Sequence, residues 1–210
     1  MKDFNYWWNI EGDPKETKYF NENGFSSYAR VEIDNNFFFV KRMQNHLSRS
    51  LIHPRGIPTL IQEVNAINHL KDSGVKTPDI IFSSAYKSGG QWKAILVTKE
   101  MENFISLKDW YNNINKEINE EMKNKIIREI AWTFRKMHLA KRQHGNCNAG
   151  NIFIHTNGYV HAGFIGLENS KKRLTRSQAK IHDFNQLKKN SPMIPKEDWK
   201  LFLSYYSQLA

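Results

Sequence analysis

Cysteine is almost absent from this 210-residue sequence, because Cys147 is its single thiol. An internal disulfide is therefore excluded, and a reducing compartment is favoured. No apolar run approaches the roughly 18 residues that a membrane-spanning helix requires. The N-terminal residues also lack the basic and then apolar pattern of a signal peptide. We therefore expect a cytoplasmic protein.

Acidic residues are the scarcer charged class, with 21 Asp and Glu against 31 Lys and Arg, and the formal net charge is +10. This balance favours anionic partners such as a nucleotide, a phosphorylated sugar, an anionic membrane or nucleic acid. The basic residues are densest from Lys171 to Lys189, where they form either a functional patch or a solvated helix face. Aromatic residues do not alternate with this cluster, so nucleic acid is the least favoured partner.

Low-complexity segments and internal repeats are absent, and the length suits one domain or two small lobes. Residues 1–20 are aromatic and irregular in pattern, and the pair Trp7 and Trp8 is expected to anchor this terminus on the core. Residues 25–42 predict a β-hairpin that turns at 34–36.

Periodicity in the rest of the chain alternates between the helical and the strand type. A helix is predicted between Pro58, which suits a first turn, and Gly74, which suits a C-terminal cap. Two strands are predicted at 80–82 and 94–97. Further helices are predicted over 117–141, over 171–190 and around 199–205.

The stretch from His144 to Ser170 organises the chain. His144-Gly145-Asn146 is followed five residues after Asn146 by Asn151. An apolar run at 152–154, a tight Asn-Gly turn at 156–158 and a second run predict two paired strands. In kinase-like folds such a unit carries the catalytic loop and then the metal-binding segment.

These residues resemble the lipopolysaccharide core kinases of the Kdo/WaaP family, and most closely its InaA-like branch. The resemblance rests on His144-Gly145 and on the segments 3–9, 47–63 and 167–187. It implies an α+β, protein-kinase-like fold of two lobes. We expect a sheet-rich N-terminal lobe with one long helix over residues 1–100, and a mainly helical lobe with the catalytic-type loop at 144–151 over residues 101–210.

The resemblance also implies a reaction. Phosphate would pass from ATP, with Mg²⁺, to a heptose or Kdo sugar of the lipopolysaccharide inner core. The partner would be this core or another anionic glycolipid, reached from the cytoplasm at the anionic surface of the inner membrane. Backbone groups at 99–101 would hold the adenine ring.

Four residues would bind the nucleotide if the resemblance holds. Lys41 would contact the phosphates, and Glu63 would orient it. Gly24 and Ser26 would bring backbone N–H groups to the phosphates. Considered without the resemblance, residues 23–27 are better interpreted as an ordinary turn.

The catalytic loop departs from the family pattern at two positions. Asn146 and Gly166 stand where the resemblance calls for Asp, although His144 would still shape the loop and Asn151 would still bind metal. Glu168 would supply a replacement carboxylate for metal or catalysis if a strand continues through 166–168, whereas its ordinary role is a surface ion pair. Asp183 is a remoter candidate.

The two departures leave the function open between two alternatives. The first is an active sugar kinase that uses Glu168. The second is a pseudokinase that keeps the fold for binding or regulation after losing catalysis, since Mg²⁺ prefers anionic oxygen ligands and Asn146 cannot accept a proton as a carboxylate does.

Overall fold

A computed structural model describes residues 2–12, 17–21, 24–48, 54–114 and 120–208. The chain divides into two compact units, Met1–Asn65 with Pro78–Met101, and Ala66–Thr77 with Glu102–Ala210. Among the described residues, no helix is both long and apolar enough to cross a membrane.

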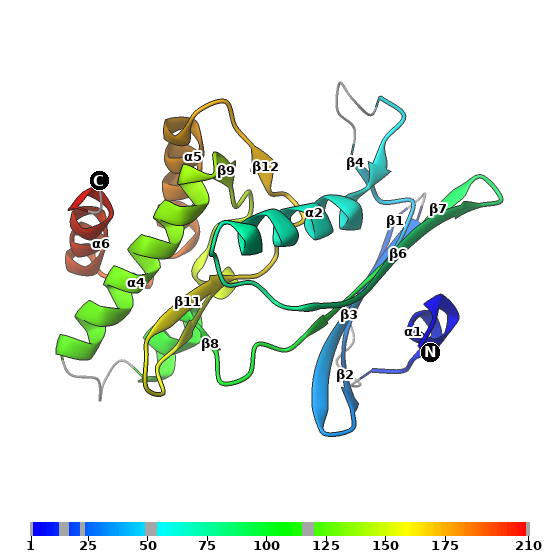
Figure 1. Cartoon of the computed structure of the whole chain (residues 1–210), viewed down its shortest axis with the longest axis horizontal. Helices are drawn as coiled ribbons and strands as arrows, with labels where there is room; N and C mark the ends of the chain where they lie inside the picture. The colour runs from blue at the N-terminus through cyan, green and yellow to red at the C-terminus, as the bar shows by residue number, and fades with distance from the viewer. Residues whose placement is uncertain (1, 13–16, 22–23, 49–53, 115–119, 209–210) are drawn as a thin grey trace. The chain divides into compact units, whose positions relative to one another are not determined.

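The first unit is built on an antiparallel sheet of five strands in the order β1-β2-β3-β7-β6 (Figure 1). The strands are β1 (Thr17–Asn21), β2 (Gly24–Ile33), β3 (Asn36–Gln44), β6 (Ile80–Ser88) and β7 (Gln91–Lys99). Asp34 and Asn35 join β2 to β3 with φ of 52° and 58°, as a two-residue hairpin turn requires. The predicted hairpin and the two later strands are confirmed.

The N-terminus differs from its prediction as an irregular segment. Phe4–Asn9 forms helix α1, whose N-cap Asp3 accepts a hydrogen bond from the Tyr6 backbone N–H. Trp7 is buried in the core of the unit, so the predicted anchoring is confirmed. Buried Arg42 on β3 secures it further by donating to the carbonyls of Trp7 (3.3 Å) and Ile10 (2.5 Å).

Helix α2 (Thr59–Asp72) confirms the helix predicted between Pro58 and Gly74, and its residues are shared between the two units. Gly74 follows the last turn with φ of +71°, the left-handed conformation that ends many helices. Before α2, β4 (Leu47–Ser48) pairs with β5 (Ile57–Pro58). Residues 49–53 of the family-like segment 47–63 lie outside the described residues.

The second unit packs around α4 (Glu120–Leu139). Fully buried Phe134 on this helix contacts three aromatic rings, one each from β11, α5 and α6, with centroid distances of 4.8, 5.9 and 5.6 Å to Phe164, Phe184 and Phe202. The remaining elements are β8 (Ile105–Ser106), α3 (Leu107–Asp109), a π-helical turn (Trp110–Ile114), β9 (Arg142–Gln143), a 3₁₀ turn (Ala149–Asn151), β10 (Ile152–His155), β11 (His161–Phe164), β12 (Lys171–Lys172), α5 (Arg176–Asn190) and α6 (Lys196–Gln208).

Two predictions in this unit need correction. The helix predicted over 171–190 begins only at Arg176, because Thr175 and Gln178 form a reciprocal capping box there, and the residues before it form β12, which pairs with β9. The paired strands β10 and β11 are confirmed, but residues 156–160 join them, so the connection is longer than a tight Asn-Gly turn.

Candidate functional site

Lys41 and Glu63 form an ion pair within the first unit. Lys41 lies on β3 between Tyr28 of β2 and Leu96 of β7, and Glu63 lies on α2. The Lys41 Nζ lies 2.6 Å from Glu63 Oε1, and the Glu63 side chain is only 4% exposed. A carboxylate buried to this degree needs a charged partner. The structure therefore brings together two residues 22 positions apart.

Gly24 and Ser26 lie in β2. The interpretation of residues 23–27 as an ordinary turn is therefore wrong for these two residues. Ser26 pairs with Tyr19 of β1 and Met43 of β3. A Cβ on Gly24 would lie 2.0 Å from the Gln44 carbonyl oxygen, so close strand contact requires glycine here. β1 pairs with β2 in antiparallel register, and Asn21, the last residue of β1, lies opposite Gly24.

The backbone at 99–101 ends β7. The Glu100 N–H donates to the Phe37 carbonyl (2.9 Å), so this N–H is not the one that a nucleotide would use. The Glu100 carboxylate accepts two hydrogen bonds from the Arg30 guanidinium, at 3.0 and 2.8 Å.

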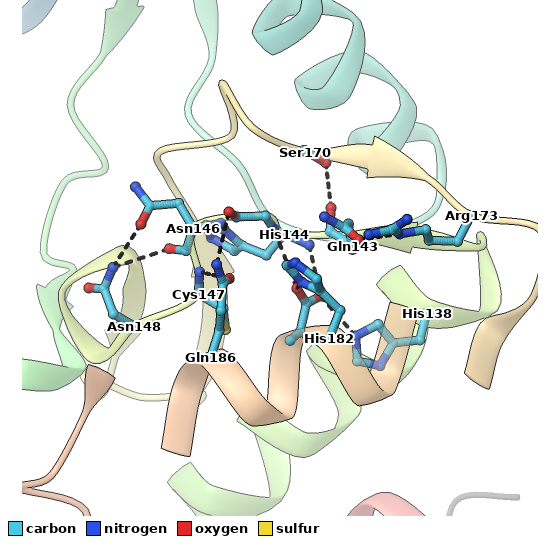
Figure 2. A network of polar contacts seen from close by, with 12 residues as sticks. His138, Gln143, His144, Asn146, Cys147, Asn148, Ser170, Arg173, His182 and Gln186 are labelled. Atoms are coloured by element: carbon cyan, nitrogen blue, oxygen red, sulfur yellow. Dashed lines mark hydrogen bonds and ion pairs between the residues drawn. The ribbon is translucent and has the colours of Figure 1, made fainter. Parts of the chain in front are cut away.

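In the second unit, Asp183 of α5 holds the start of the catalytic-type loop. Its Oδ2 accepts from the His144 N–H (2.8 Å) and lies 3.1 Å from His138 Nε2, and its Oδ1 accepts from the Gly145 N–H (3.4 Å). Figure 2 shows His138 and His182 beside this network. Burial alone would raise the pKa of Asp183, but hydrogen bonds from His138 and the His144 backbone keep it below its usual value. Asp183 is thus a buried brace under the loop.

Further contacts from α5 complete this support. Gln186 Oε1 accepts from the Cys147 N–H (2.8 Å), and its Nε2 donates to the Gly145 carbonyl (3.2 Å). The Ala149 N–H donates to Ser191 Oγ just beyond the helix (2.8 Å). Burial raises the pKa of the Cys147 thiol, so this cysteine is structural and not a reactive thiolate.

His144 is fully buried, and its ring contacts Phe164 edge-on at a centroid distance of 5.4 Å. Its Nδ1 accepts from the Asn146 N–H (3.3 Å), which places the ring proton on Nε2. Burial lowers the pKa of His144, against the opposing charges of Asp183 and Glu168. The neutral ring therefore packs inside the loop, as its predicted shaping role requires.

Asn146, Asn151 and Glu168 are joined by hydrogen bonds at the same loop. The Asn146 Nδ2 donates to Glu168 Oε1 (3.3 Å), and Asn151 Nδ2 donates to the Asn146 carbonyl (2.8 Å). Asn148 Nδ2 donates to the same carbonyl (3.1 Å), as Figure 2 shows. Glu168 is thus hydrogen-bonded to Asn146, one of the two positions where the resemblance calls for Asp.

Gly166 follows a strand that ends earlier than expected. β11 stops at Phe164 and Gly166 has φ of +67°, so strand alternation does not relate Gly166 to Glu168. A Cβ at Gly166 would lie 3.0 to 3.1 Å from the Asn151 amide atoms. The Asn151 amide therefore lies against the position where the resemblance calls for a carboxylate.

Asn151 and Glu168 together provide the smallest number of carboxylate ligands, one, with which proteins commonly hold Mg²⁺. In the described parts of the chain, no three His, Cys, Asp or Glu side chains cluster as a protein-held metal would require. Glu168 offers one carboxylate, and Asn151 can offer only its amide oxygen, because the lone pair of an amide nitrogen is delocalised and does not bind Mg²⁺. Mg²⁺ in phosphate-transfer sites is commonly held by one or two carboxylates together with substrate phosphates and water.

Sequence reasoning missed the role of Asp183 and did not single out Gln186. The only signal was an acidic residue on the apolar side of a basic helix, beside Phe184 and Leu187. Such a placement marks a buried, bonded carboxylate better than it marks a metal ligand.

Comparison with known proteins identifies the family. Protein InaA of Escherichia coli strain K12 is 42% identical over 205 residues, 97% of this chain and 95% of that protein. The 3-deoxy-D-manno-octulosonic acid kinase of Vibrio cholerae is 33% identical over 126 residues, 55% of this chain and 51% of that protein.

A solved structure described as WaaP in complex with acyl carrier protein has the same fold, with a TM-score of 0.74 and 21% identity over 98% of this chain and 82% of that one. The family model matches residues 5–206. An antiparallel sheet unit, a helical unit and a kinase-type loop agree with these matches, so the chain has a kinase-like fold and belongs to the lipopolysaccharide kinase (Kdo/WaaP) family.

Proposed function

We propose that this protein binds ATP and transfers its terminal phosphate to an inner-core sugar of lipopolysaccharide, a heptose or Kdo. The observation that carries the proposal is the 2.6 Å Lys41–Glu63 ion pair. In kinases, a strand Lys held by a helix Glu binds the nucleotide phosphates. The family of lipopolysaccharide kinases supports the choice of acceptor, which would be an anionic glycolipid.

The proposed roles follow the two groups of residues. Lys41 would bind ATP phosphates while Glu63 keeps its ammonium oriented, and the backbone at Gly24 and Ser26 would cover them. In the loop, the Asn146 amide would orient the acceptor hydroxyl. Glu168, hydrogen-bonded to that amide, would take the hydroxyl proton as the oxygen bonds to phosphorus and ADP leaves.

The same carboxylate is the anionic group that the loop offers to a metal. Asn151 and Glu168 would hold Mg²⁺, which when bound neutralises charge on the nucleotide phosphates. His144 would not touch the substrate, because it is fully buried. It would act by keeping the Asn146 backbone in place.

The first experiment is a thermal-shift titration of the full chain with ATP, with and without Mg²⁺. Ligand at about 100 times its Kd stabilises a protein by roughly 2.7 kcal/mol. We expect ATP to raise the melting temperature of the wild type and not that of Lys41→Met. Lys87→Met, a matched change at an exposed lysine on β6, should keep the rise. An equal shift in both variants would contradict the proposed role of Lys41.

The second experiment measures turnover. ADP release in the presence of lipopolysaccharide core oligosaccharide should require Lys41 and should fall in Glu168→Gln, since that variant keeps the shape but loses the charge. Absence of ADP release with every core acceptor at high Mg²⁺ would refute the kinase activity while leaving ATP binding standing.

The alternative is a pseudokinase with a binding or regulatory role. One observation favours it. Gly166 has no side chain to bind a metal, and the Asn151 amide lies against the position that such a side chain would occupy. Asp tolerates positive φ better than most residues, so Gly166→Asp is feasible if the amide shifts by a few tenths of an ångström. Turnover gained only in the double variant Asn146→Asp/Gly166→Asp, with ATP binding already present in the wild type, would support this alternative.

A further inference from the structure

Three large apolar side chains are exposed near the start of α5 and the β9–β12 pair. Leu174, between β12 and α5, is 82% exposed, Leu139 at the end of α4 is 51% exposed, and Ile181 on α5 is 55% exposed. A single exposed leucine needs no explanation. The Arg173 N–H donates to the Lys141 carbonyl (2.7 Å), so the segments that carry Leu139 and Leu174 lie together, and exposed apolar side chains grouped in this way suggest contact with an apolar partner.

The segment that carries Leu174 and Ile181 exposes charge of one sign. From Lys171 to Asn190 the sequence carries seven Lys and Arg residues and a single acidic residue, Asp183, which is fully buried. Every exposed charge of this segment is therefore positive. Lys141, also exposed, adds to them two residues after Leu139.

The backbone that presents these side chains is well supported. β9 pairs with β12, and the Arg173 N–H donates to the Lys141 carbonyl (2.7 Å), which joins the segments that carry the two leucines. The Ser170 hydroxyl donates to the Gln143 carbonyl (2.7 Å), and Arg173 Nε donates to the Gln143 side chain, as Figure 2 shows. Less conformational freedom is therefore lost when this surface binds a partner.

We propose that these residues form a membrane-docking surface for anionic phospholipid bilayers, with Leu174 inserted below the headgroups. The surface, here named the basic tip, comprises Leu139, Lys141, Lys171, Lys172, Arg173, Leu174 and Arg176. The proposal deepens the proposed function and rests on it for its purpose, because a glycolipid acceptor lies in a membrane.

Two signals together make a bilayer the best-fitting partner. Basic side chains are attracted to anionic headgroups, and an apolar side chain among them can enter the acyl region. Neither signal alone gives stable anchoring. Nucleic acid fits less well, because bases stack on aromatic rings and guanidinium planes, whereas the most exposed side chain here is a leucine.

The test is co-sedimentation of the full chain with vesicles of phosphatidylcholine containing phosphatidylglycerol, against vesicles of phosphatidylcholine alone. We expect binding to the anionic vesicles that weakens with salt. Because each basic side chain near such a surface contributes about fivefold in affinity, Lys171→Gln/Lys172→Gln should lose roughly 25-fold. Leu174→Ala should lose roughly 50-fold in affinity, because three carbons leave the apolar region.

Matched controls use the same substitutions elsewhere in the second unit. Leu203→Ala changes another exposed leucine, on α6, and Lys108→Gln/Lys125→Gln removes two exposed charges. Both controls should bind as the wild type does. Equal losses in the controls would overturn the proposal, because general charge and not the basic tip would then explain the binding.

A second measurement reports insertion directly. Leu174→Cys, labelled with an environment-sensitive dye, should show a blue shift on anionic vesicles, whereas Leu203→Cys with the same dye should show none. The native thiol does not interfere, because Cys147 is fully buried.

Three outcomes would overturn the proposal: no partition of the wild type onto anionic vesicles, equal partition onto neutral ones, or salt-sensitive binding to duplex DNA without vesicle binding. None of these depends on ATP. Vesicle binding that fails while the ATP-induced thermal shift persists would reject the docking surface alone. The reverse pattern would reject the proposed nucleotide site and leave the docking surface in place.

Discussion

Removal of the Asp183 carboxylate tests whether α5 holds the catalytic-type loop in place. This side chain accepts from the backbone N–H groups of His144 and Gly145 and contacts the rings of His138 and His182, at distances of 2.8, 3.4, 3.1 and 3.2 Å respectively. Of these, the His144 N–H and the His138 ring belong to fully buried residues. Asp183→Ala leaves both without their acceptor.

The expected loss of stability in Asp183→Ala follows from the two contacts with buried groups. A hydrogen bond to a charged group contributes about 1.5–3 kcal/mol, so the loss of two in Asp183→Ala should lower the free energy of unfolding by roughly 3–6 kcal/mol. In Asp183→Asn the amide oxygen can still accept at the Oδ2 position, while the amide nitrogen replaces Oδ1 opposite the Gly145 N–H. We expect a smaller loss of about 1–2 kcal/mol for this variant.

Urea unfolding followed by circular dichroism measures both variants against Asp72→Ala, a control at an exposed position on α2. Because the pKa of Asp183 is below its usual value in the folded state, its charge stabilises the fold above the unfolded pKa. That contribution is lost as the pH falls from the unfolded pKa of about 3.9 toward the folded value, so the gap between wild type and Asp183→Asn should shrink only in that range. A loss in Asp183→Ala no larger than in the control would refute the bracing role.

The remaining predictions concern single positions of the loop. Gly145→Ala should destabilise by more than about 3 kcal/mol in urea unfolding, because overpacking and left-handed strain add there: the new Cβ would meet the Asn169 carbonyl oxygen at 2.0 Å and φ is +84°. Gly158→Ala has nearly the same φ of +85° but open space around it, so it should lose only about 1–2 kcal/mol; equal effects would show that the contact with Asn169 does not matter. Burial lowers the pKa of His144, so the stability that its neutral ring provides is full above the unfolded pKa of about 6.5 and declines as the pH falls below it. The pH dependence of unfolding between about pH 6.5 and 5 should therefore be shallower in His144→Gln than in the wild type.

The local patterns of the sequence predicted the elements that later carry the candidate site. Two strand-like runs on either side of a turn cluster predicted β2 and β3, and helical spacing between a proline and a glycine predicted α2, so Lys41 was assigned to a strand and Glu63 to a helix. These assignments succeed because the period of apolar residues reflects the backbone geometry of each element. The single cysteine and the net charge of +10 needed no structure at all.

Short and irregular elements were the ones that local patterns failed to predict. α1 has six residues, too few for a helical period to be visible among its aromatic side chains, and its stability depends on Trp7 burial and on Arg42 from a distant strand. β12 has two residues and exists because β9 pairs with it. Partners of this kind lie far apart in the sequence, so no local window contains both.

Sequence alone determined that a kinase-type loop and a strand lysine are present, since both are read from residue identity and spacing. The resemblance had already paired Glu63 with Lys41, but only the tertiary structure showed their contact, and it alone decided that Glu168 meets Asn146 and that Asp183 meets the backbone of His144. The physical reason is that hydrogen bonds and ion pairs depend on atoms within about 3 Å of one another. Folding brings such atoms together across 22 to 39 positions of the chain, a separation that spacing rules do not span.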